Sequence, residues 1–293
     1  LGGNIRGTAT LPLLKKVKAG GIVVLELDSW QLQGFGDAKT SPHIAVFTTF
    51  FPDHLNYYNG NLKQYFTDKA NIFKYQKQGD TFIVGDTVVK NVPMSARKNA
   101  IVVSSRTLPR AWRLRIPGEH NRFNAACAVA ACRALGVSER DIKKGVESFS
   151  GVEGRLQFLR TVRGIKIYND NSSTTPEATI AALRALDPKM QKKIVLIIGG
   201  DEKNLDMSAL INIIPRHCSK VILFKEHGTD RIREEVFAKE RNEVRVYEEN
   251  GLRNCVLRAF EVAKRREIIL YSPAFSSFGR YFKNEYDRGD QFV

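Results

Sequence analysis

The sequence predicts an α/β fold with two domains in succession, and two observations support this prediction. Short apolar runs rich in Val and Ile recur along the whole chain of 293 residues. After residue 150 these runs alternate with helical patterns of about ten to fifteen residues, which is typical of a parallel sheet wound with helices on both faces. We therefore expect residues 1–150 to form an α/β domain and residues 151–293 to form a Rossmann-like, doubly wound domain.

Four apolar runs predict strands in the first domain, and two patterned stretches predict helices. The strand candidates are GIVVLEL (21–27), HIAVFTTF (43–50), DTFIVGD (80–86) and NAIVVSS (99–105). Residues 61–76 predict a helix because Leu62, Phe66 and the pair Ile72–Phe73 fall near one face. A second predicted helix, 120–136, ends at Gly136, a frequent C-cap residue, and Ser138 is expected to cap the helix that follows.

The second domain is predicted to begin with a hairpin that turns at Arg163–Gly164. Four helices and four strands then alternate to the end of the chain. Ligands of open α/β sheets bind beyond the carboxyl ends of the strands. The loops YNDNSSTT (168–175), GGDEKN (199–204) and SPAFSSF (272–278) follow predicted strands and are therefore candidate binding loops.

The composition narrows the class of partner. The formal net charge of +15 implies an anionic partner. Nucleic acid is not expected, because the basic runs KKVK (15–18) and AKRRE (263–267) are short and lack interleaved aromatic residues. No run approaches the roughly eighteen apolar residues that a membrane span needs. The four cysteines show no metal or redox spacing, so we expect reduced thiols in a cytoplasmic protein. We also expect a monomer without a membrane partner.

Polar residues near the predicted strand ends of the first domain suggest a cation site. Glu26 lies near the end of one strand, and His54 follows another. A carboxylate and an imidazole in these places could bind Mg²⁺. The alternative is that Asp53 caps its loop beside a hydrogen-bonded His54. Lys69 lies in the middle of a predicted helix, where a lysine is ordinarily solvated.

Four other residues could contact a nucleotide or a carboxylate. Asn121 and Asn124 lie three apart at a helix start, hence on one face, where they could bind a base or cap the helix. Arg155 follows the expected domain boundary and could bind a phosphate or lie free at the surface. Lys203 lies in a glycine-rich loop, from which it could reach a carboxylate.

Nine short stretches, in order along the chain, resemble the Mur ligases, ATP-dependent enzymes that add amino acids to the peptidoglycan precursor. They are GGNI, LELDSWQL, FPDHLNYY, DKANIF, GEHNRFNA, FSGVEGR, YNDNSSTT, IIGGDEKN, and SPAFSSF with FKNEYDRGDQF. LELDSWQL and FKNEYDRG are most similar to the branch that adds D-glutamate to UDP-N-acetylmuramoyl-L-alanine. The resemblance implies a central ATP-binding α/β domain, present in part, followed by a domain that binds the incoming amino acid.

The resemblance also implies a role for each matching residue. Such enzymes phosphorylate a carboxylate with ATP and Mg²⁺ at two sites, and an amine then attacks the acyl phosphate. The implied metal ligands are Glu26, His54 and Lys69, the last as a carbamate formed with carbon dioxide. The implied catalytic residues are Lys69, His54 and Lys203. The implied nucleotide contacts are Asn121, Asn124, Arg155 and Asp170, the last to the ribose. The implied substrate contacts are Asn4, Gln31, Lys203 and Ser277. Lys203 and Ser277 are expected to hold D-glutamate, with Ser277 at the start of the last helix.

Several positions depart from the family pattern. Gly154 stands where the family usually has a histidine, and Ser172 where it has a lysine. Thr49 replaces an asparagine before the Asp–His pair. The segment 277–282 carries one residue more than the pattern. These departures concern the amino-acid pocket more than the reaction class.

The family's phosphate loop, G-x-x-G-K-[ST], occurs nowhere in the 293 residues, and neither does a match to its uridine-binding domain. We therefore expect the chain to be part of a longer enzyme and to be inactive alone. Two alternatives remain. One is another amino-acid ligase of the superfamily, such as a different Mur ligase or a folylpolyglutamate-synthase-like enzyme. The other is a non-catalytic nucleotide-binding module.

Overall fold

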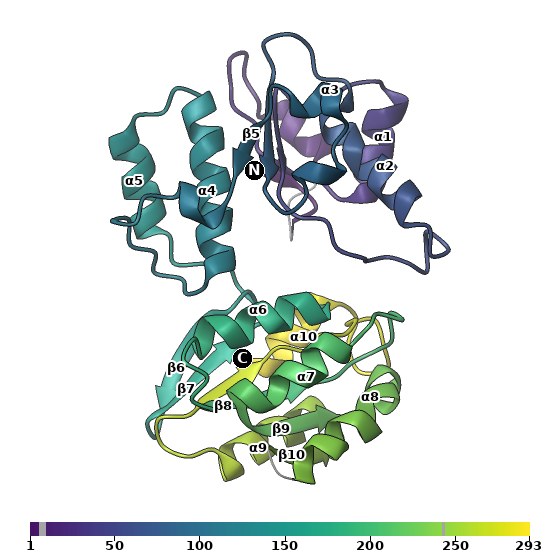
Figure 1. Cartoon of the computed structure of the whole chain (residues 1–293), viewed down its shortest axis with the longest axis vertical. Coiled ribbons are helices and arrows are strands. Elements are labelled where there is room, and N and C mark those ends of the chain that lie inside the picture. Colours follow the sequence, from purple (N-terminus) through teal and green to yellow (C-terminus); the bar gives the residue numbers. More distant parts are fainter. Residues whose placement is uncertain (6–9, 242–243) are drawn as a thin grey trace. The chain divides into compact units, whose positions relative to one another are not determined.

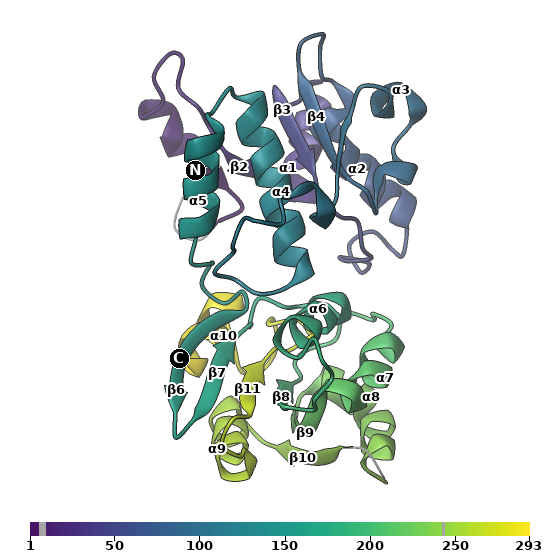
Figure 2. The ribbon, with the colours of Figure 1, turned by 60° about the vertical axis from the view of Figure 1, so that its left-hand side comes forward.

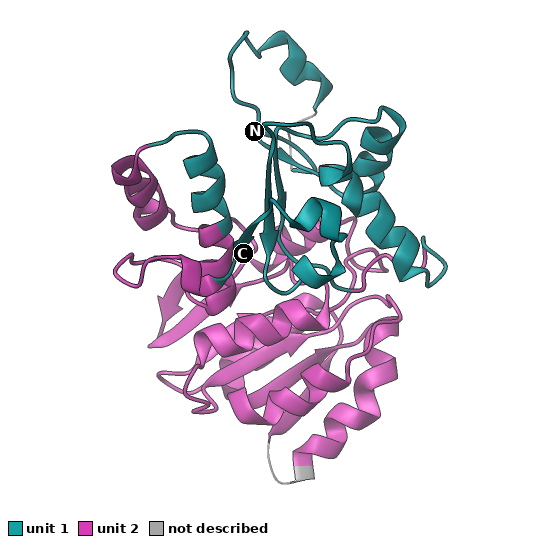
Figure 3. Cartoon of the chain, turned by 45° about the horizontal axis from the view of Figure 1, so that its top comes forward, with its two compact units in different colours: residues 1–51, 57–104, 127–137 teal, residues 52–56, 105–126, 138–293 magenta. Residues whose placement is uncertain are grey.

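The computed structural model describes residues 1–5, 10–241 and 244–293, and they divide into two compact units. Unit 1 comprises residues 1–51, 57–104 and 127–137, and unit 2 comprises residues 52–56, 105–126 and 138–293 (Figure 3). By this division, residues 105–126 and 138–150 group with the C-terminal part of the chain. The two domains expected from the sequence, 1–150 and 151–293, remain a prediction.

Unit 1 contains two small parallel sheets and the helices beside them. A two-stranded sheet pairs β1 (Gly2–Gly3) with β2 (Leu25–Glu26). A three-stranded sheet has the order β3 (Ile44–Phe47), β4 (Thr81–Gly85) and β5 (Ile101–Val103). The α-helices that lie wholly in this unit are α1 (Ser29–Asp37), α2 (Leu62–Lys74) and α3 (Met94–Arg97). Short 3₁₀ turns occur at Leu11–Lys15 and Val89–Asn91.

The predicted strand 21–27 forms over only two residues. Its paired part, β2, has as its partner the two-residue strand β1, so few ladder hydrogen bonds are available. Ile22, Val23 and Val24 lie outside the ladder and are exposed. The other three predicted strands and the helix over 61–76 are confirmed with shorter ends.

The two helices that follow begin and end as the sequence predicts. Helix α4 (Glu119–Ala134) is followed by Gly136, whose φ of 74° is the left-handed conformation that glycine adopts readily. Helix α5 (Glu139–Ser148) starts after Ser138, whose hydroxyl accepts a hydrogen bond from the backbone N–H of Asp141 at 3.2 Å.

Unit 2 is built on a six-stranded sheet with the order β10-β9-β8-β11-β7-β6 (Figures 1 and 2). The strands are β6 (Gln157–Val162), β7 (Ile165–Asn169), β8 (Ile194–Ile198), β9 (Cys218–Phe224), β10 (Arg245–Glu249) and β11 (Ile268–Tyr271). Only β6 is antiparallel to its neighbour, because it forms the predicted hairpin with β7 through Arg163–Gly164. The other pairs are parallel, as the strand–helix alternation predicts.

Helices cover both faces of this sheet, which confirms the doubly wound fold. They are α6 (Pro176–Leu186), α7 (Ser208–His217), α8 (His227–Ala238), α9 (Leu252–Val262) and α10 (Glu285–Phe292). Along β8, Leu196 packs in one core cluster with residues of α6, α7 and α8. The next residue, Ile197, packs in a second cluster with residues of α9 and α10. This alternation explains why the strand reads as one continuous apolar run.

Candidate functional site

Three neighbouring strands of unit 2 bring the predicted binding loops together. In the sheet β11 lies between β8 and β7, although it comes last in the chain. The segments that follow these strands, 170–175, 199–204 and 272–278, therefore leave the same edge of the sheet. A strand order that reverses in this way creates the crevice where open α/β sheets bind ligands.

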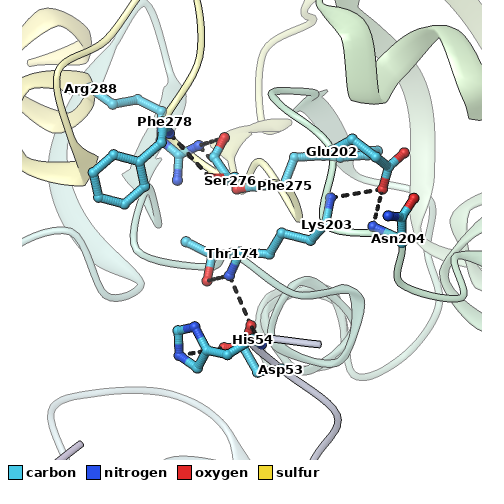
Figure 4. Close-up of polar contacts among 10 residues, drawn as sticks. All are labelled: Asp53, His54, Thr174, Glu202, Lys203, Asn204, Phe275, Ser276, Phe278 and Arg288. Atoms are coloured by element: carbon cyan, nitrogen blue, oxygen red, sulfur yellow. Dashed lines mark hydrogen bonds and ion pairs between the residues drawn. The ribbon is translucent and has the colours of Figure 1, made fainter. Parts of the chain in front are cut away.

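Lys203, in the loop after β8, is the best-defined polar group of this site (Figure 4). Its Nζ donates hydrogen bonds to Oδ1 of Asp53 at 3.0 Å and to Oγ1 of Thr174 at 3.2 Å. The side chain is 21% exposed, so the ion pair is partly shielded from water. The sequence predicts that Lys203 binds a carboxylate, and in the structure that carboxylate belongs to Asp53.

Asp53 also supports the backbone of its own loop. Its Oδ1 accepts a hydrogen bond from the N–H of His54 at 2.8 Å, and its Oδ2 lies 3.6 Å from the Nε2 atom of the same histidine. His54 has a φ of 54°, an unusual conformation for a residue with a side chain. The arrangement matches the alternative in which Asp53 organises the loop, and the metal-binding role of His54 remains a prediction.

Asp170, directly after β7, is buried and fully hydrogen-bonded within unit 2. Its Oδ1 accepts from the N–H of Leu156 at 2.8 Å, and its Oδ2 accepts from the hydroxyls of Ser272 at 2.8 Å and Ser173 at 2.5 Å. Burial raises the pKa of Asp170 to about 6, although these bonds and nearby Arg155 act in the opposite direction. The carboxyl group ties the loops after β7 and β11 together, and its ribose contact remains a prediction.

Ser277 lies in this site, but the expectation that it starts the last helix is wrong. Helix α10 begins at Glu285, because Asn284 caps it by accepting hydrogen bonds from the N–H groups of Tyr286 and Asp287. Ser277 is buried in the preceding loop. A two-way backbone bridge between Asp201 and Ser276 holds that loop beside the one after β8.

Two of the departures from the family pattern are in contact with each other. The N–H of Ser172 donates to the carbonyl oxygen of Gly154 at 3.0 Å. Gly154 has a φ of 69°, and a Cβ atom there would collide with Oδ1 of Asn171. Any other residue at this position would therefore need Asn171 to move and would adopt a left-handed backbone, which glycine adopts most readily.

The other three predicted nucleotide contacts of unit 2 are less buried than Asp170. Asn121, in the first turn of α4, donates from Nδ2 to the carbonyl of Pro117 at 2.7 Å. Asn124 is exposed one turn later, on the same face. Arg155 is exposed and is close enough to Asp170 to act on its pKa. This bond is a donation to a carbonyl that precedes the helix and caps no N–H of the first turn, so both the nucleotide roles and the capping alternative remain predictions.

Three predicted site residues lie near the first strands of unit 1. The N–H of Asn4 donates to the carbonyl of Glu26 at 2.7 Å, so these residues are neighbours across the β1–β2 pair. The Glu26 side chain is exposed. Gln31 forms a capping box with Asp28 at the start of α1. The Oε1 atom of Gln31 accepts a hydrogen bond from the N–H of Asp28, and Oδ1 of Asp28 accepts one from the N–H of Gln31.

Lys69 lies in the middle of α2, as predicted. The side chain is half-buried, and its Nζ is 5.1 Å from the centre of the Tyr65 ring. The adjacent Asp68 is buried and accepts hydrogen bonds from Gln33, Tyr58 and Gln64. Asp68 is therefore committed to the packing of α1 on α2, which leaves Lys69 as the candidate functional group on this turn.

The predicted metal ligands are divided between the units, with Glu26 and Lys69 in unit 1 and His54 in unit 2. Within the part of the chain that the structure describes, no group of three or more His, Cys, Asp or Glu residues is placed to bind a metal ion. The described helices include none with the length and apolar character needed to cross a membrane. The four cysteines are unpaired thiols, as predicted.

The structure also draws attention to three residues to which the sequence assigned no ligand. Thr174 and Asp53 both bind Lys203. Arg288, on α10, is fully buried and donates to three backbone carbonyls of the site loops. Thr174 and Arg288 lie in the matching stretches YNDNSSTT and FKNEYDRG, which was the only signal that could have singled them out.

Two family models match the chain. The Mur ligase middle domain matches residues 7–111, and the glutamate ligase domain of Mur ligases matches residues 154–275. Among solved structures, a UDP-N-acetylmuramate–alanine ligase from Thermotoga maritima superposes with a TM-score of 0.65 at 15% identity, covering 92% of this chain and 63% of its own. A folylpolyglutamate synthase from Mycobacterium tuberculosis, complexed with ADP, gives 0.61 at 18% identity, covering 80% and 61%. At these identities the likeness concerns the fold.

Curated relatives match over nearly the whole chain, and each of the following three is named UDP-N-acetylmuramoylalanine–D-glutamate ligase. The protein from Roseiflexus sp. is 32% identical over 100% of this chain and 68% of its own length. The one from Lacticaseibacillus paracasei is 33% identical over 99% and 65%, and the one from Aquifex aeolicus is 32% identical over 93% and 66%. The chain thus spans about two thirds of the length of these relatives. On its sequence stretches, its fold and these matches together, it belongs to the Mur ligase family.

Proposed function

We propose that the chain is part of a ligase that joins D-glutamate to UDP-N-acetylmuramoyl-L-alanine with ATP. The observation that carries the proposal is the match over 93–100% of the chain to relatives that bear this name. The site of unit 2 supports it, because Lys203 already holds a carboxylate there at 3.0 Å. In the reaction, the substrate carboxylate takes a phosphoryl group from ATP, and the neutral amine of D-glutamate then displaces phosphate to form the amide.

Unit 2 supplies the amino-acid pocket in this proposal. Lys203 exchanges the carboxylate of Asp53 for one of D-glutamate. During the exchange, Thr174 keeps its hydrogen bond to the ammonium group of Lys203. Ser277 offers its hydroxyl to the second carboxylate. With both carboxylates fixed, the amine is oriented toward the acyl phosphate, and orientation of this kind accounts for a large part of the rate of bimolecular reactions on enzymes.

We assign the remaining contacts by the resemblance. Asn121, Asn124, Arg155 and Asp170 contact ATP. Asn4 and Gln31 contact the uridine-linked substrate. The protein works as a monomer in the cytoplasm.

We further propose that Mg²⁺ is bound by Glu26, His54 and a carbamate on Lys69. The exposed carboxylate of Glu26 is a suitable oxygen ligand, whereas the ammonium of Lys69 cannot bind a cation. Reaction of this amine with carbon dioxide would replace the ammonium with two anionic oxygens. When bound, the metal would offset negative charge on the phosphate oxygens.

The test uses two proteins, because the sequence contains no G-x-x-G-K-[ST] loop. Residues 1–293 alone are expected to show no ATP turnover. The second protein joins this chain to the segment that precedes the matching region in the Roseiflexus relative; we call it the fusion protein. With UDP-N-acetylmuramoyl-L-alanine, ATP and Mg²⁺, it is offered D-glutamate, L-glutamate, L-alanine and diaminopimelate separately.

We expect amide formation by the fusion protein with D-glutamate only. The preceding segment of the relative without this chain serves as the background control. Preference for one of the other amino acids would reject the substrate assignment but leave a ligase. Turnover by residues 1–293 alone would show that the chain needs no further segment.

A further inference from the structure

One buried arginine connects the loops that carry the proposed amino-acid site. Arg288 lies on α10 and is the largest of the fully buried side chains among the described residues. Its Nη1 donates to the carbonyl oxygens of Phe275 at 3.1 Å and Ser276 at 3.0 Å (Figure 4). Its Nη2 donates to the carbonyl oxygen of Asn171 at 2.6 Å. A single guanidinium therefore holds the loop after β11 against the loop after β7.

The third loop of the site also packs against this group. A Cβ atom on Gly200, at the end of β8, would lie 3.5 Å from Nη1 of Arg288. Gly200 is three residues before Lys203, and Ser276 directly precedes Ser277. The guanidinium thus contacts the loops that carry both residues proposed to hold the two carboxylates of D-glutamate.

The positive charge of Arg288 has no counter-ion in contact. All three acceptors are neutral carbonyl groups, and no carboxylate of the described residues forms an ion pair with it. Its Nε is buried and has no hydrogen-bond partner in the described part of the chain. Burying a charge without compensation is costly. A neutral side chain with hydrogen-bonding groups could hold the loops together at a lower desolvation cost. The buried charge itself therefore needs an explanation.

We propose that Arg288 is a positioning and specificity-determining residue, whose buried charge, which no carboxylate contacts directly, makes the loops of Lys203 and Ser277 selective for an amino acid with two carboxylates. The inference rests on the proposed function and deepens it. A charge inside the protein is screened less by salt and water than one at the surface, so it acts on a ligand without direct contact. A dicarboxylate gains more from this field than a monocarboxylate of the same shape.

The experiment compares D-glutamate with D-glutamine, which has the same shape and one carboxylate fewer. Each is titrated into residues 1–293, and the dissociation constant is followed by NMR shifts of the loop amides. For Arg288→Met we expect the constant for D-glutamate to rise about tenfold or more and that for D-glutamine about threefold or less, since the lost term is electrostatic. Arg253→Met is the matched control: this arginine is exposed on α9, and we expect both constants to stay within about twofold.

If Arg288 only holds the loops together, Arg288→Met will weaken the binding of D-glutamate and D-glutamine by the same factor. That result would overturn the proposal. Failure of the wild-type chain to bind D-glutamate at all would instead count against the proposed function. Thermal unfolding shows whether Arg288→Met is folded, and the next variant decides the question if it is not.

Arg288→Lys keeps a cation that can lose its proton when buried, whereas arginine does not. The groups that act electrostatically on this position are Tyr271 on β11, Glu285 on α10 and Glu226 before α8. We measure the dissociation constant for D-glutamate at pH 6 and pH 9 in both proteins. The ratio of the pH 9 constant to the pH 6 constant should be about tenfold larger in Arg288→Lys than in wild type. Equal pH dependence in the two proteins would contradict a role for the charge.

Discussion

The two units differ in how completely their sheets are covered. Every residue of β8 in unit 2 is fully buried, because helices lie on both faces of the sheet. In unit 1, Val23 and Val24 next to β2 are 43% and 57% exposed, and Val102 of β5 is 47% exposed. The contrast is one of extent, because Ile83 and Val84 on the central strand β4 of unit 1 are also fully buried, and Phe158 on the edge strand β6 of unit 2 is 51% exposed.

The proposed site residues of the two units also differ in how deeply they are buried. In unit 2, Asp170 and Ser277 are buried, and Lys203 is held by two partners. In unit 1, Glu26 is exposed and Lys69 is half-buried. A covered sheet fixes the loops at its edge, since each loop packs against its neighbours. The comparison indicates that the proposed amino-acid pocket is held by more contacts within the protein than the proposed metal ligands of unit 1.

The largest expected effect tests the metal-binding side of this comparison. Lys69→Arg in the fusion protein should abolish ligation, because a guanidinium stays protonated and does not form a carbamate. The fold should survive, since arginine is a comparable helix former. The matched control is Lys74→Arg on the same helix, where the lysine also lies over a tyrosine ring, at 5.2 Å. Ligation rates and thermal unfolding are measured for both, and near-normal turnover in Lys69→Arg would return this lysine to a structural role.

The difference in coverage itself predicts a difference in stability. Leu196→Ala in β8 should lower the free energy of unfolding by about 2–5 kcal/mol, because the cavity forms in a fully buried strand. Val24→Ala, at an exposed apolar position, should change it by less than about 0.5 kcal/mol. Urea unfolding of both variants gives the two numbers. Comparable losses would mean that Val24 is covered as completely as Leu196.

Asp170 predicts a pH dependence that belongs to unit 2. Its folded-state pKa of about 6 lies above the ordinary 3.8, so the protonated form favours folding. The contribution is fully present below about pH 3.8 and is lost as the pH rises through about 6; the difference corresponds to at most about 3 kcal/mol. The unfolding free energy of wild type minus that of Asp170→Asn should therefore fall between pH 4 and pH 7. A difference that stays flat or rises would show that Asp170 is ionised in the fold at little cost.

Lys203→Ala sharpens the comparison at the pocket. The dissociation constant for D-glutamate should rise by an amount equal to about 1.5–3 kcal/mol, the usual range for a charged hydrogen bond. The KM for ATP in the fusion protein should change much less. Lys143→Ala, an exposed lysine on α5, is the control. If the ATP constant changes as much as the D-glutamate constant, Lys203 does not belong to the amino-acid pocket.

The smallest effect is expected at Gln31 in unit 1. Gln31→Ala removes one half of the capping box of α1 and should cost about 0.5–1 kcal/mol of unfolding free energy. Urea unfolding measures the loss, and titration of the fusion protein with UDP-N-acetylmuramoyl-L-alanine measures the proposed substrate contact. A substrate affinity equal to that of wild type would restrict Gln31 to its capping role.

Local sequence patterns predicted most of the helices and strands. The errors arose where contacts between distant parts of the chain determine the structure. The apolar runs of β8 and β11 and the cap at Ser138 depend on neighbouring residues, so the sequence shows them directly. The run 21–27 satisfies the same pattern, but a strand needs a partner, and β1 offers only two residues. The start of α10 was misplaced because contacts with Asp201, far away in the chain, hold Ser276 in a loop.

The site shows the same division. The family resemblance pointed to Lys203 and Ser277, which the structure places on loops at one edge of a sheet. Neither spacing nor composition could show that Asp53 binds Lys203, since 150 residues separate them. Burial of Arg288 without a counter-ion is likewise a property of the packed structure, because arginines in a sequence are ordinarily expected at the surface.

The contact between Gly154 and the loop of Ser172 has a consequence for the order in which mutations can accumulate. A histidine at position 154 could adopt the left-handed backbone, as His54 does, but its Cβ atom would collide with Oδ1 of Asn171. The Asn171 side chain would therefore have to move or be replaced. The side chain that limits position 154 is thus Asn171, whose Nδ2 donates to the carbonyl oxygen of Glu285 at 2.7 Å, so a substitution at 154 or 171 changes which residues the other position tolerates.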